Sequence, residues 1–314
     1  MINENASMTE IDFARLPNLF LIGAAKTGTT SLHDVLSQHP EIFCSKVKEP
    51  RFFTQEDRYA RGLKWYQDTY FLNAAGYPRR GESTATYLYW STVSAPRIKL
   101  VYGEHELKLI TALRDPVKRA YSFYWMKKHS GLETLSFEDA LEHENERWDR
   151  NWERLQHSGR DEFGYYRGGC YATLLQPFLE LFPRDAFAFV LLEDFQNNFT
   201  GTMTSLANFL GVQPDFKFRP MLSNPSALPK NPGIDRFLHH PSGLLHKLLK
   251  PFTHQLPYTF RDRLKKGLIR SNWHSVSYPP MNTETERQLR LRYGEEIERL
   301  ESILGRDLSS WKTV

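Results

Sequence analysis

A short glycine-rich segment near the start of the chain carries residue types that suit phosphate binding. Residues 23–30 read GAAKTGTT, so Lys26 lies between Gly23 and Gly28 and is followed by hydroxylated side chains. Where such a segment leads into a helix, unpaired backbone N–H groups point outward and the helix dipole favours negative charge. Glycines let the chain wrap closely around a phosphate group. The segment therefore predicts an anion-binding loop, in preference to a tight turn with a surface lysine.

The position of the lysine separates this loop from that of the nucleotide triphosphatases. Their loop reads G-x-x-x-x-G-K-[ST]; Gly23 and Gly28 have this spacing, but Thr29 stands where the lysine belongs. A triphosphate enzyme also needs Mg²⁺ held by a Ser or Thr and a distant Asp, for which Asp194 is a weak candidate. Lys26, ahead of the second glycine, is suited instead to neutralise a bridging oxygen as a bond breaks.

The residues on either side of this loop predict that it joins a strand to a helix. The apolar run at 19–22 is typical of a buried parallel strand. Leu32, Val35 and Leu36 then follow helical spacing, and Pro40 marks the end of that helix. The loop is thus predicted to lie at a helix N-terminus.

Further strand and helix patterns define the fold class. Residues 107–113 read as a strand, and Asp115 and Pro116 then open a helix to about residue 128, with Asp115 as N-cap. Helices are expected at about 171–182, before Gly211 and at 283–304, and a strand at 187–192. This alternation predicts an α/β, P-loop-like three-layer fold: a central parallel sheet flanked by helices, with a helical C-terminal addition.

Two segments near the start of the chain resemble a known family. Residues 17–32, PNLFLIGAAKTGTTSL, resemble the 5′-phosphosulfate-binding loop of the sulfotransferases, most of all the carbohydrate type that includes heparan sulfate N- and 3-O-sulfotransferases. Residues 48–53, KEPRFF, resemble a segment that follows in the same group. The resemblance implies 3′-phosphoadenosine-5′-phosphosulfate (PAPS) as donor, adenosine-3′,5′-bisphosphate (PAP) as product and no metal. It implies that the donor is bound by Lys26, Thr27, Gly28, Thr29, Thr30 and Ser31.

A second resemblance places a phosphate site after the second strand. Residues 113–122, LRDPVKRAYS, are similar to the family's 3′-phosphate element, which implies Arg114 and Ser122 as ligands. The guanidinium is a bidentate phosphate donor, and Ser122 falls about two turns into the helix on the face that Asp115 begins. Alone, the segment fits a helix start with a surface arginine equally well. Beside the first loop, it predicts a bisphosphorylated nucleotide across the sheet's C-terminal edge.

The remaining site residues are predicted from weaker resemblances. Residues 81–87, GESTATY, resemble the segment that supplies a glutamate base, which implies Glu82 as base and Lys26 as stabiliser of the leaving phosphate; a solvated strand-end acid is the alternative for Glu82. Tyr171 and Arg236 are further candidates for contact with the nucleotide. The heparan-type Lys-Gly-Arg cap is absent, since residues 274–276 read HSV.

The domain organisation follows from length and proline content. The 314 residues fit one elaborated domain, so we predict a flexible arm at 1–15 and a single sulfotransferase domain at 16–314. Prolines crowd 212–232, which predicts a loop, and 238–270 is basic and expected to be helical in pieces. We expect the irregular insertion at 212–270, with the aromatic stretch 65–71, to wall the acceptor cleft.

The composition of the chain narrows the classes of molecule that it is expected to bind. A net charge of +4 does not indicate nucleic-acid binding, and no apolar stretch is long enough to span a bilayer. Cys44 and Cys170 are the only cysteines, which favours reduced thiols and a cytoplasmic location. The 11 histidines lack metal-ligand spacing. The expected partner is an acceptor that is a glycan or a small hydroxylated molecule.

Several alternatives stay open from the sequence. A P-loop nucleotide kinase would show Mg²⁺-dependent turnover of ATP. A non-catalytic nucleotide or glycan binder would leave Glu82 idle. Within the sulfotransferases, the acceptor could instead be a small phenol, a lipid or a carrier-bound intermediate, because acceptor choice depends on loops.

Overall fold

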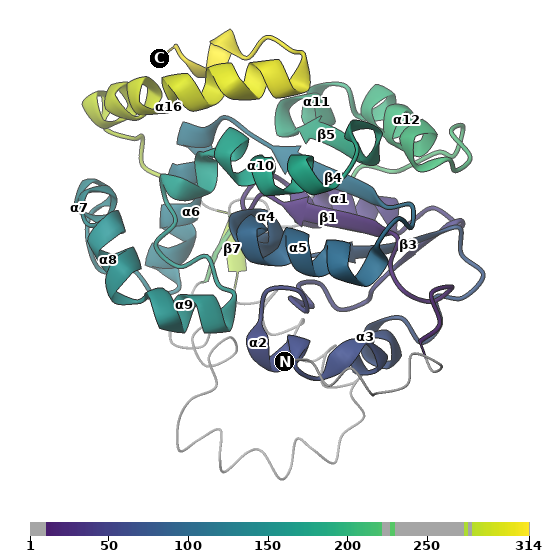
Figure 1. Cartoon of the computed structure of the whole chain (residues 1–314). Helices are drawn as coiled ribbons and strands as arrows, with labels where there is room; N and C mark the ends of the chain where they lie inside the picture. The colour runs from purple at the N-terminus through teal and green to yellow at the C-terminus, as the bar shows by residue number, and fades with distance from the viewer. Residues whose placement is uncertain (1–10, 222–226, 230–272, 276–277, 314) are drawn as a thin grey trace.

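A five-stranded parallel sheet lies at the centre of the computed structural model, which describes residues 11–221, 227–229, 273–275 and 278–313. The strand order is β2-β3-β1-β4-β5 (Figure 1). The strands are β1 Leu19–Gly23, β2 Ile42–Cys44, β3 Arg79–Ser83, β4 Lys108–Leu113 and β5 Phe187–Leu191. The predicted parallel α/β fold is confirmed, and β1, which carries the glycine-rich loop, is the middle strand.

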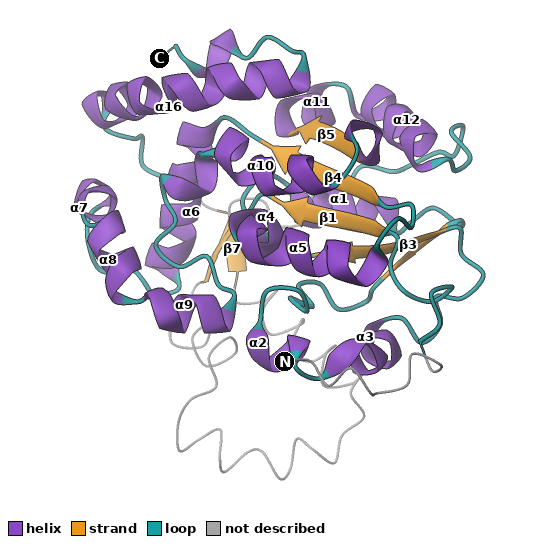
Figure 2. Cartoon of the chain, in the orientation of Figure 1, coloured by secondary structure: helices purple, strands orange, loops and turns teal. Residues whose placement is uncertain are grey.

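Helices cover both faces of this sheet, as Figure 2 shows. The α-helices up to the end of β4 are α1 Thr29–Leu36, α2 Glu56–Tyr59, α3 Gly62–Tyr70, α4 Thr86–Tyr89 and α5 Ser91–Tyr102. Those that follow β4 are α6 Pro116–His129, α7 Phe137–Glu142, α8 Glu144–Arg150, α9 Trp152–Ser158, α10 Tyr171–Leu181, α11 Leu192–Asn197, α12 Phe199–Leu210 and α16 Thr283–Leu304. Short 3-10 turns occur at Arg167–Gly169, Arg184–Ala186 and Ser309–Trp311.

Alternation along β1 divides the core into two layers. Phe20 and Ile22 belong to the cluster formed with α4, α5, α10 and α16, whereas Leu19 and Leu21 belong to the cluster formed with α1 and α12. Phe20 and Ile22 are fully buried. Because both faces are covered, the strand is apolar throughout, which explains why its continuous apolar run was recognisable in the sequence.

The C-terminal helix packs on the first of these layers. Leu289, Tyr293, Ile297 and Leu300 are buried along one side of α16 and join the cluster that contains α10. Figure 1 shows α16, in yellow, lying over α10 and α6. The predicted helical C-terminal addition is therefore part of the core that supports the sheet.

Two predictions made from the sequence differ in detail from the structure. Residues 11–15 belong to the folded part: Ile11 and Phe13 pack against the core, and the backbone N–H of Asp12 donates to Gln67 Oε1 at 2.9 Å. The proline-rich segment, predicted as loop only, contains the strand β6, Ala227–Pro229, which pairs antiparallel with β7, Trp273–Ser275. Its partner lies far away in the sequence, so local composition gave no signal for the pairing. The predicted basic helical segment at 238–270 lies outside the described residues.

Two compositional expectations can be compared with the described residues. Cys44 and Cys170 are both free thiols. No helix in the described ranges has the length and apolar character needed to cross a membrane.

Candidate active site

The glycine-rich loop leaves the C-terminal end of β1 and ends at the first turn of α1. Gly28 is the N-cap of α1 and has a φ of +84°, a conformation that favours glycine. A Cβ on Gly28 would lie 2.8 Å from Leu192 Cδ1, so a side chain at this position would require Leu192 to shift. The N–H of Ala24 donates to the Ala112 carbonyl at 2.8 Å, which fixes the loop against β4. In the described part of the chain no side chain caps α1, so its first-turn N–H groups can bind an anion.

Lys26 lies within this loop in a positively charged environment. Burial, followed by the charges of Arg114, Arg119 and Lys127, lowers the pKa of Lys26 to about 8. Among the described residues, none places a carboxylate oxygen within 4.0 Å of its ammonium. Lys127 pairs with Asp161 at 3.8 Å, but Lys26 has no such partner in the described structure. A buried lysine among other cations is the electrostatic pattern of an anion-binding site.

The predicted second phosphate element follows β4, the strand beside β1. Asp115 is the N-cap of α6 as predicted, and its carboxylate accepts from the N–H groups of Val117 and Lys118 at 2.9 and 3.2 Å. Arg114 lies at the strand end, with Nη1 3.5 Å from the Lys26 carbonyl, so the two predicted anion elements meet. Ser122 is buried in α6, and its hydroxyl makes no hydrogen bond to another described side chain or backbone group.

Tyr171 and Arg236 were the other residues predicted to contact the nucleotide. Tyr171 is buried at the start of α10, and its hydroxyl donates to the Arg114 carbonyl at 2.9 Å. This contact lets Tyr171 position the strand end that carries Arg114; direct contact with a nucleotide stays a prediction. Arg236 lies outside the described residues.

Glu82 lies inside the molecule rather than on its surface. It belongs to β3, is 1% exposed and is therefore not a solvated strand-end acid. The Thr84 hydroxyl donates to Glu82 Oε1 at 2.6 Å, and the Tyr66 hydroxyl donates to Oε2. Tyr66 comes from α3, the aromatic segment that was expected to wall the cleft, and packs against Phe52. Both carboxylate oxygens are thus held by hydroxyl groups from defined elements.

The environment of Glu82 shifts the pKa of its carboxyl group to near neutral pH. Burial raises the pKa of Glu82 to about 7, against hydrogen bonds from Thr84, Tyr66 and Tyr87 that lower it, while the nearby Glu49 carboxylate raises it further. Desolvation penalises the charged form, whereas hydroxyl donors stabilise that form. A carboxyl group with a pKa near 7 is suited to accept a proton at physiological pH.

Two polar contacts beside the loop were not predicted. Lys48 Nζ donates to Thr30 Oγ1 at 2.8 Å, and His33 Nδ1 lies 2.7 Å from Ser83 Oγ. Burial, with a smaller effect from the charge of Lys48, lowers the pKa of His33 to about 4, so this imidazole is neutral at physiological pH. Lys48 was part of the recognised KEPRFF segment, and that motif was the available signal for its role.

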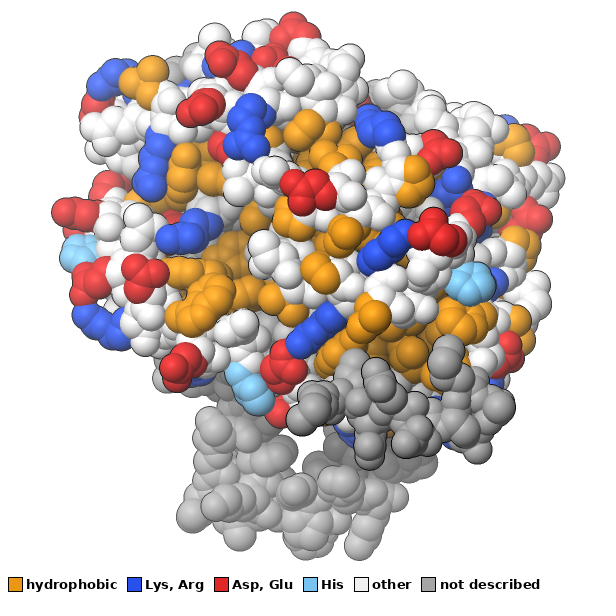
Figure 3. All heavy atoms as spheres, in the orientation of Figure 1, with side chains coloured by type: hydrophobic (Ala, Val, Ile, Leu, Met, Phe, Trp, Pro, Cys, Tyr) orange, Lys and Arg blue, Asp and Glu red, His pale blue; other side chains and the backbone are white. Residues whose placement is uncertain are grey.

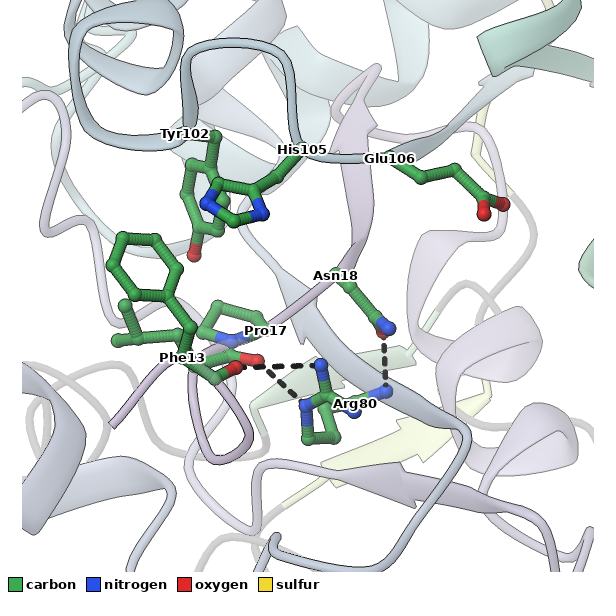
Figure 4. Close-up of a pocket in the computed structure, with 8 residues that line it drawn as sticks. Phe13, Pro17, Asn18, Arg80, Tyr102, His105 and Glu106 are labelled. Atoms are coloured by element: carbon green, nitrogen blue, oxygen red, sulfur yellow. Dashed lines mark hydrogen bonds between the residues drawn. The ribbon is translucent and has the colours of Figure 1, made fainter. Parts of the chain in front are cut away.

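A small cavity at the opposite edge of the sheet is not a competing site. It encloses about 100 Å³ near the N-terminal ends of β1, β3 and β4 (Figure 4). Arg80 lines it, but the Arg80 guanidinium donates to the Leu16 carbonyl at 2.7 Å and is thus already engaged. In the described ranges no group of three or more His, Cys, Asp or Glu side chains is arranged to hold a metal ion. The two anion-binding elements and Glu82 place the candidate site at the C-terminal edge of β1, β3 and β4.

Comparison with known proteins identifies the family. The family described as "Sulfotransferase domain" matches residues 16–226. Mouse heparan sulfate glucosamine 3-O-sulfotransferase 3B1 is 31% identical over 205 residues, which cover 63% of this chain and 47% of that protein. Mouse carbohydrate sulfotransferase 15 is 27% identical over 290 residues, which cover 76% of this chain and 51% of that protein. The chain thus spans about half the length of these curated relatives.

A solved structure supports the same conclusion over most of the chain. The crystal structure of a sulfotransferase from Alicyclobacillus acidocaldarius matches with a TM-score of 0.67 and 25% identity, covering 95% of this chain and 99% of that one. The parallel sheet, the glycine-rich loop and the family match place this chain in the sulfotransferase class of proteins. This chain belongs to the sulfotransferase domain family, and its relatives include enzymes named for heparan sulfate and carbohydrate sulfation.

Proposed function

We propose that this chain transfers a sulfuryl group from PAPS to a hydroxyl or amine of a carbohydrate acceptor. The observation that carries the proposal is the meeting of two anion-binding elements at the C-terminal ends of neighbouring strands. The loop after β1 and Arg114 after β4 approach within 3.5 Å through the Lys26 carbonyl. Two phosphate positions on adjacent parallel strands suit a nucleotide with phosphates at both the 3′ and 5′ positions.

The described residues fit this donor. The open N-terminus of α1 and Lys26 would hold the 5′-phosphosulfate, and Arg114 with the Ser122 hydroxyl would hold the 3′-phosphate. Thr27 is less available than the sequence predicted, because its hydroxyl donates to the Ala24 carbonyl at 2.7 Å. Its contribution would therefore come from its backbone N–H. Arg236 cannot be placed in this scheme.

Each side chain then has a defined task in the transfer. The acceptor oxygen or nitrogen forms a bond to sulfur while the bond from sulfur to the bridging phosphate oxygen breaks, in line and through a loose transition state. The acceptor proton passes to Glu82, and the negative charge that grows on the leaving bisphosphate is stabilised by Lys26. Because Glu82 is 1% exposed, acceptor binding must open a path to this carboxylate.

The carbohydrate acceptor rests on the relatives. Their names specify heparan sulfate glucosamine and carbohydrate as acceptors. The match covers the region of the loop and of Glu82 but only about half of each relative. We therefore propose the acceptor class and leave the particular sugar undefined.

Turnover by a Glu82→Gln variant tests the proposal. PAP release from PAPS would be measured without metal, across glycosaminoglycan fragments and simple amino sugars. We expect wild-type turnover with at least one glycan, and a loss of about 100-fold to 10,000-fold in Glu82→Gln with PAP binding retained, since a general base contributes this much.

Other outcomes would contradict parts of this account. A fully active Glu82→Gln enzyme would reassign the buried carboxylate to a structural role. Tight PAP binding with no turnover on any acceptor would favour a non-catalytic binder. Mg²⁺-dependent turnover of ATP would favour a kinase.

A further inference from the structure

Lys48 reaches the candidate donor site from a separate part of the chain. It follows β2, whereas the glycine-rich loop follows β1. Its ammonium donates to the hydroxyl of Thr30 at 2.8 Å, and Thr30 is the second residue of α1. A second lysine therefore contacts the helix turn that would bind the 5′-phosphosulfate.

The ammonium of Lys48 forms no close ion pair in the described structure. Its side chain is half-buried, and burial lowers its pKa. Within the described ranges no carboxylate oxygen lies within 4.0 Å of its ammonium, although Glu49 and Asp34 are near enough to raise the pKa. Removing an ammonium from water is costly unless an anion compensates it. A bound anion would supply this compensation.

The side from which Lys48 approaches the glycine-rich loop indicates which anionic group of the donor it would contact. Residues 45–49 run along β3, since Ser45 N–H donates to the Gly81 carbonyl at 3.0 Å and Glu49 N–H donates to the Ser83 carbonyl at 2.9 Å. The carboxylate of Glu49 is close enough to raise the pKa of Glu82. Lys48 thus lies on the β3 side of the loop, where the base and the acceptor are.

Arg114 enters from the other side of the loop, because β3 and β4 flank β1 on opposite sides. The 3′-phosphate belongs with Arg114 on the β4 side. The sulfuryl group is the part of the donor that must face Glu82, because the acceptor oxygen attacks sulfur while Glu82 takes the proton. Among the donor's anionic groups, the sulfuryl group is therefore the one that extends toward Lys48.

We propose that Lys48 binds the sulfuryl group of the donor, an inference that rests on the proposed function. An ammonium has three N–H donors, so Lys48 can keep its bond to Thr30 while donating to a sulfuryl oxygen. It neutralises the negative charge that would otherwise repel an electron-rich acceptor. Lys26 and Lys48 then have separate roles. Lys26 stabilises the leaving phosphate, and Lys48 binds the sulfuryl group that is transferred.

The comparison of PAPS with PAP isolates this contact, because the two differ only by the sulfuryl group. Calorimetric affinities would be measured on the full chain for wild type, Lys48→Met and Lys48→Arg. Lys46→Met is the matched control, since Lys46 is an exposed lysine of the same segment. We expect Lys48→Met to bind PAP as wild type does and PAPS about tenfold more weakly or worse. Lys48→Arg should recover part of the PAPS affinity, and Lys46→Met should change neither.

Three results would overturn the inference. Unchanged PAPS affinity in Lys48→Met would show that no sulfuryl contact exists. An equal loss for PAP and PAPS would place Lys48 on the 5′-phosphate. A wild-type chain that binds neither nucleotide would overturn the proposed function together with this inference. If Lys48→Met does not fold, Lys48→Gln keeps a donor for Thr30 and allows the same comparison.

Discussion

At the scale of single residues, the proposed chemistry depends on how burial and hydrogen bonding oppose each other at Glu82. Burial raises the pKa of this carboxyl group to about 7, and the hydroxyl groups of Thr84 and Tyr66 limit the rise by stabilising the anion. As the proposed base, Glu82 accepts a proton only when it is deprotonated, so the proposal predicts that activity increases as pH rises through about 7. The acid limb of the pH profile is thus a direct readout of the surroundings of Glu82.

Replacing Tyr66 by Phe should move that acid limb. The Tyr66 hydroxyl donates to Glu82 Oε2, and its loss removes support from the charged carboxylate. The pKa of Glu82 should therefore rise, and the acid limb of kcat/KM should move to higher pH by roughly half a pH unit or more. The measurement is the pH dependence of kcat/KM for PAP release.

A neighbouring tyrosine provides the control for this change. Tyr59 packs against Phe52 and Phe53 in the same aromatic cluster but has no described hydrogen bond to Glu82. Tyr59→Phe should leave the acid limb in place. An acid limb that moves to lower pH in Tyr66→Phe, or equally in both variants, would contradict this role for Tyr66.

Motifs in the sequence predicted which residues belong to the candidate site, but not how deeply those residues are buried or which side chains they contact. The loop lysine, the arginine after β4 and the glutamate of β3 were all identified by motif. The burial of Glu82 and the contact between Lys48 and Thr30 were not, because each depends on segments that approach only after folding. Tyr66 is 16 positions from Glu82, and neither strand alternation nor helix periodicity relates the two.

At the scale of elements, a buried ion pair joins the C-terminal helix to the strand–helix turn that carries Arg114. Arg290 of α16 lies 3.2 Å from the Asp115 carboxylate, and the two side chains are 5% and 3% exposed. Arg290 also donates to the Trp311 carbonyl at 2.7 Å. Asp115 therefore both caps α6 and binds α16, which couples the far end of the chain to the candidate 3′-phosphate site.

Arg290→Met should destabilise the fold strongly. Without Arg290, the buried Asp115 carboxylate keeps only the N–H donors of α6 and the exposed Lys118 at 3.9 Å. Breaking a buried pair in this way costs up to about 3–5 kcal/mol. Arg287→Met is the control on the same helix, because its pair with Glu284 is 55% exposed on both sides and its loss should barely change the free energy of unfolding. The measurement is the free energy of unfolding in urea. Equal losses in the two variants would contradict a structural role for the Asp115–Arg290 pair.

Elements with strong local signals were predictable, and those with distant partners were not. The N-cap at Asp115 and the helix at 283–304 were predicted to the residue, because capping and helical spacing are local properties. The strands β2, β3, β6 and β7 were missed. Three of them have only three residues and depend on their pairing partners, and β3 reads RRGES, which has no apolar pattern. The helices α2 to α5, α7 to α9 and α11 were also missed, and all of them except α3 and α5 have seven residues or fewer.

At the scale of the whole molecule, the positive charge available to the proposed donor is local rather than global. The net charge is only +4, and Figure 3 shows acidic and basic side chains interspersed over one face. The cations that matter gather where β1, β3 and β4 end, around Lys26, Lys48 and Arg114. The fold could be predicted from strand and helix order, whereas the acceptor could not, because acceptor choice depends on loop geometry.

The most direct test of a bisphosphate donor site is calorimetric titration with PAP, without metal, against ATP with Mg²⁺. We predict micromolar binding of PAP by wild type and a loss of about tenfold or more in Arg114→Ala, because charge-assisted contacts to the 3′-phosphate disappear. Lys118→Ala, an exposed cation in the first turn of α6, should bind PAP normally. Preference for Mg²⁺-ATP, or PAP binding that Arg114→Ala leaves unchanged, would contradict the donor site proposed for this edge of the sheet.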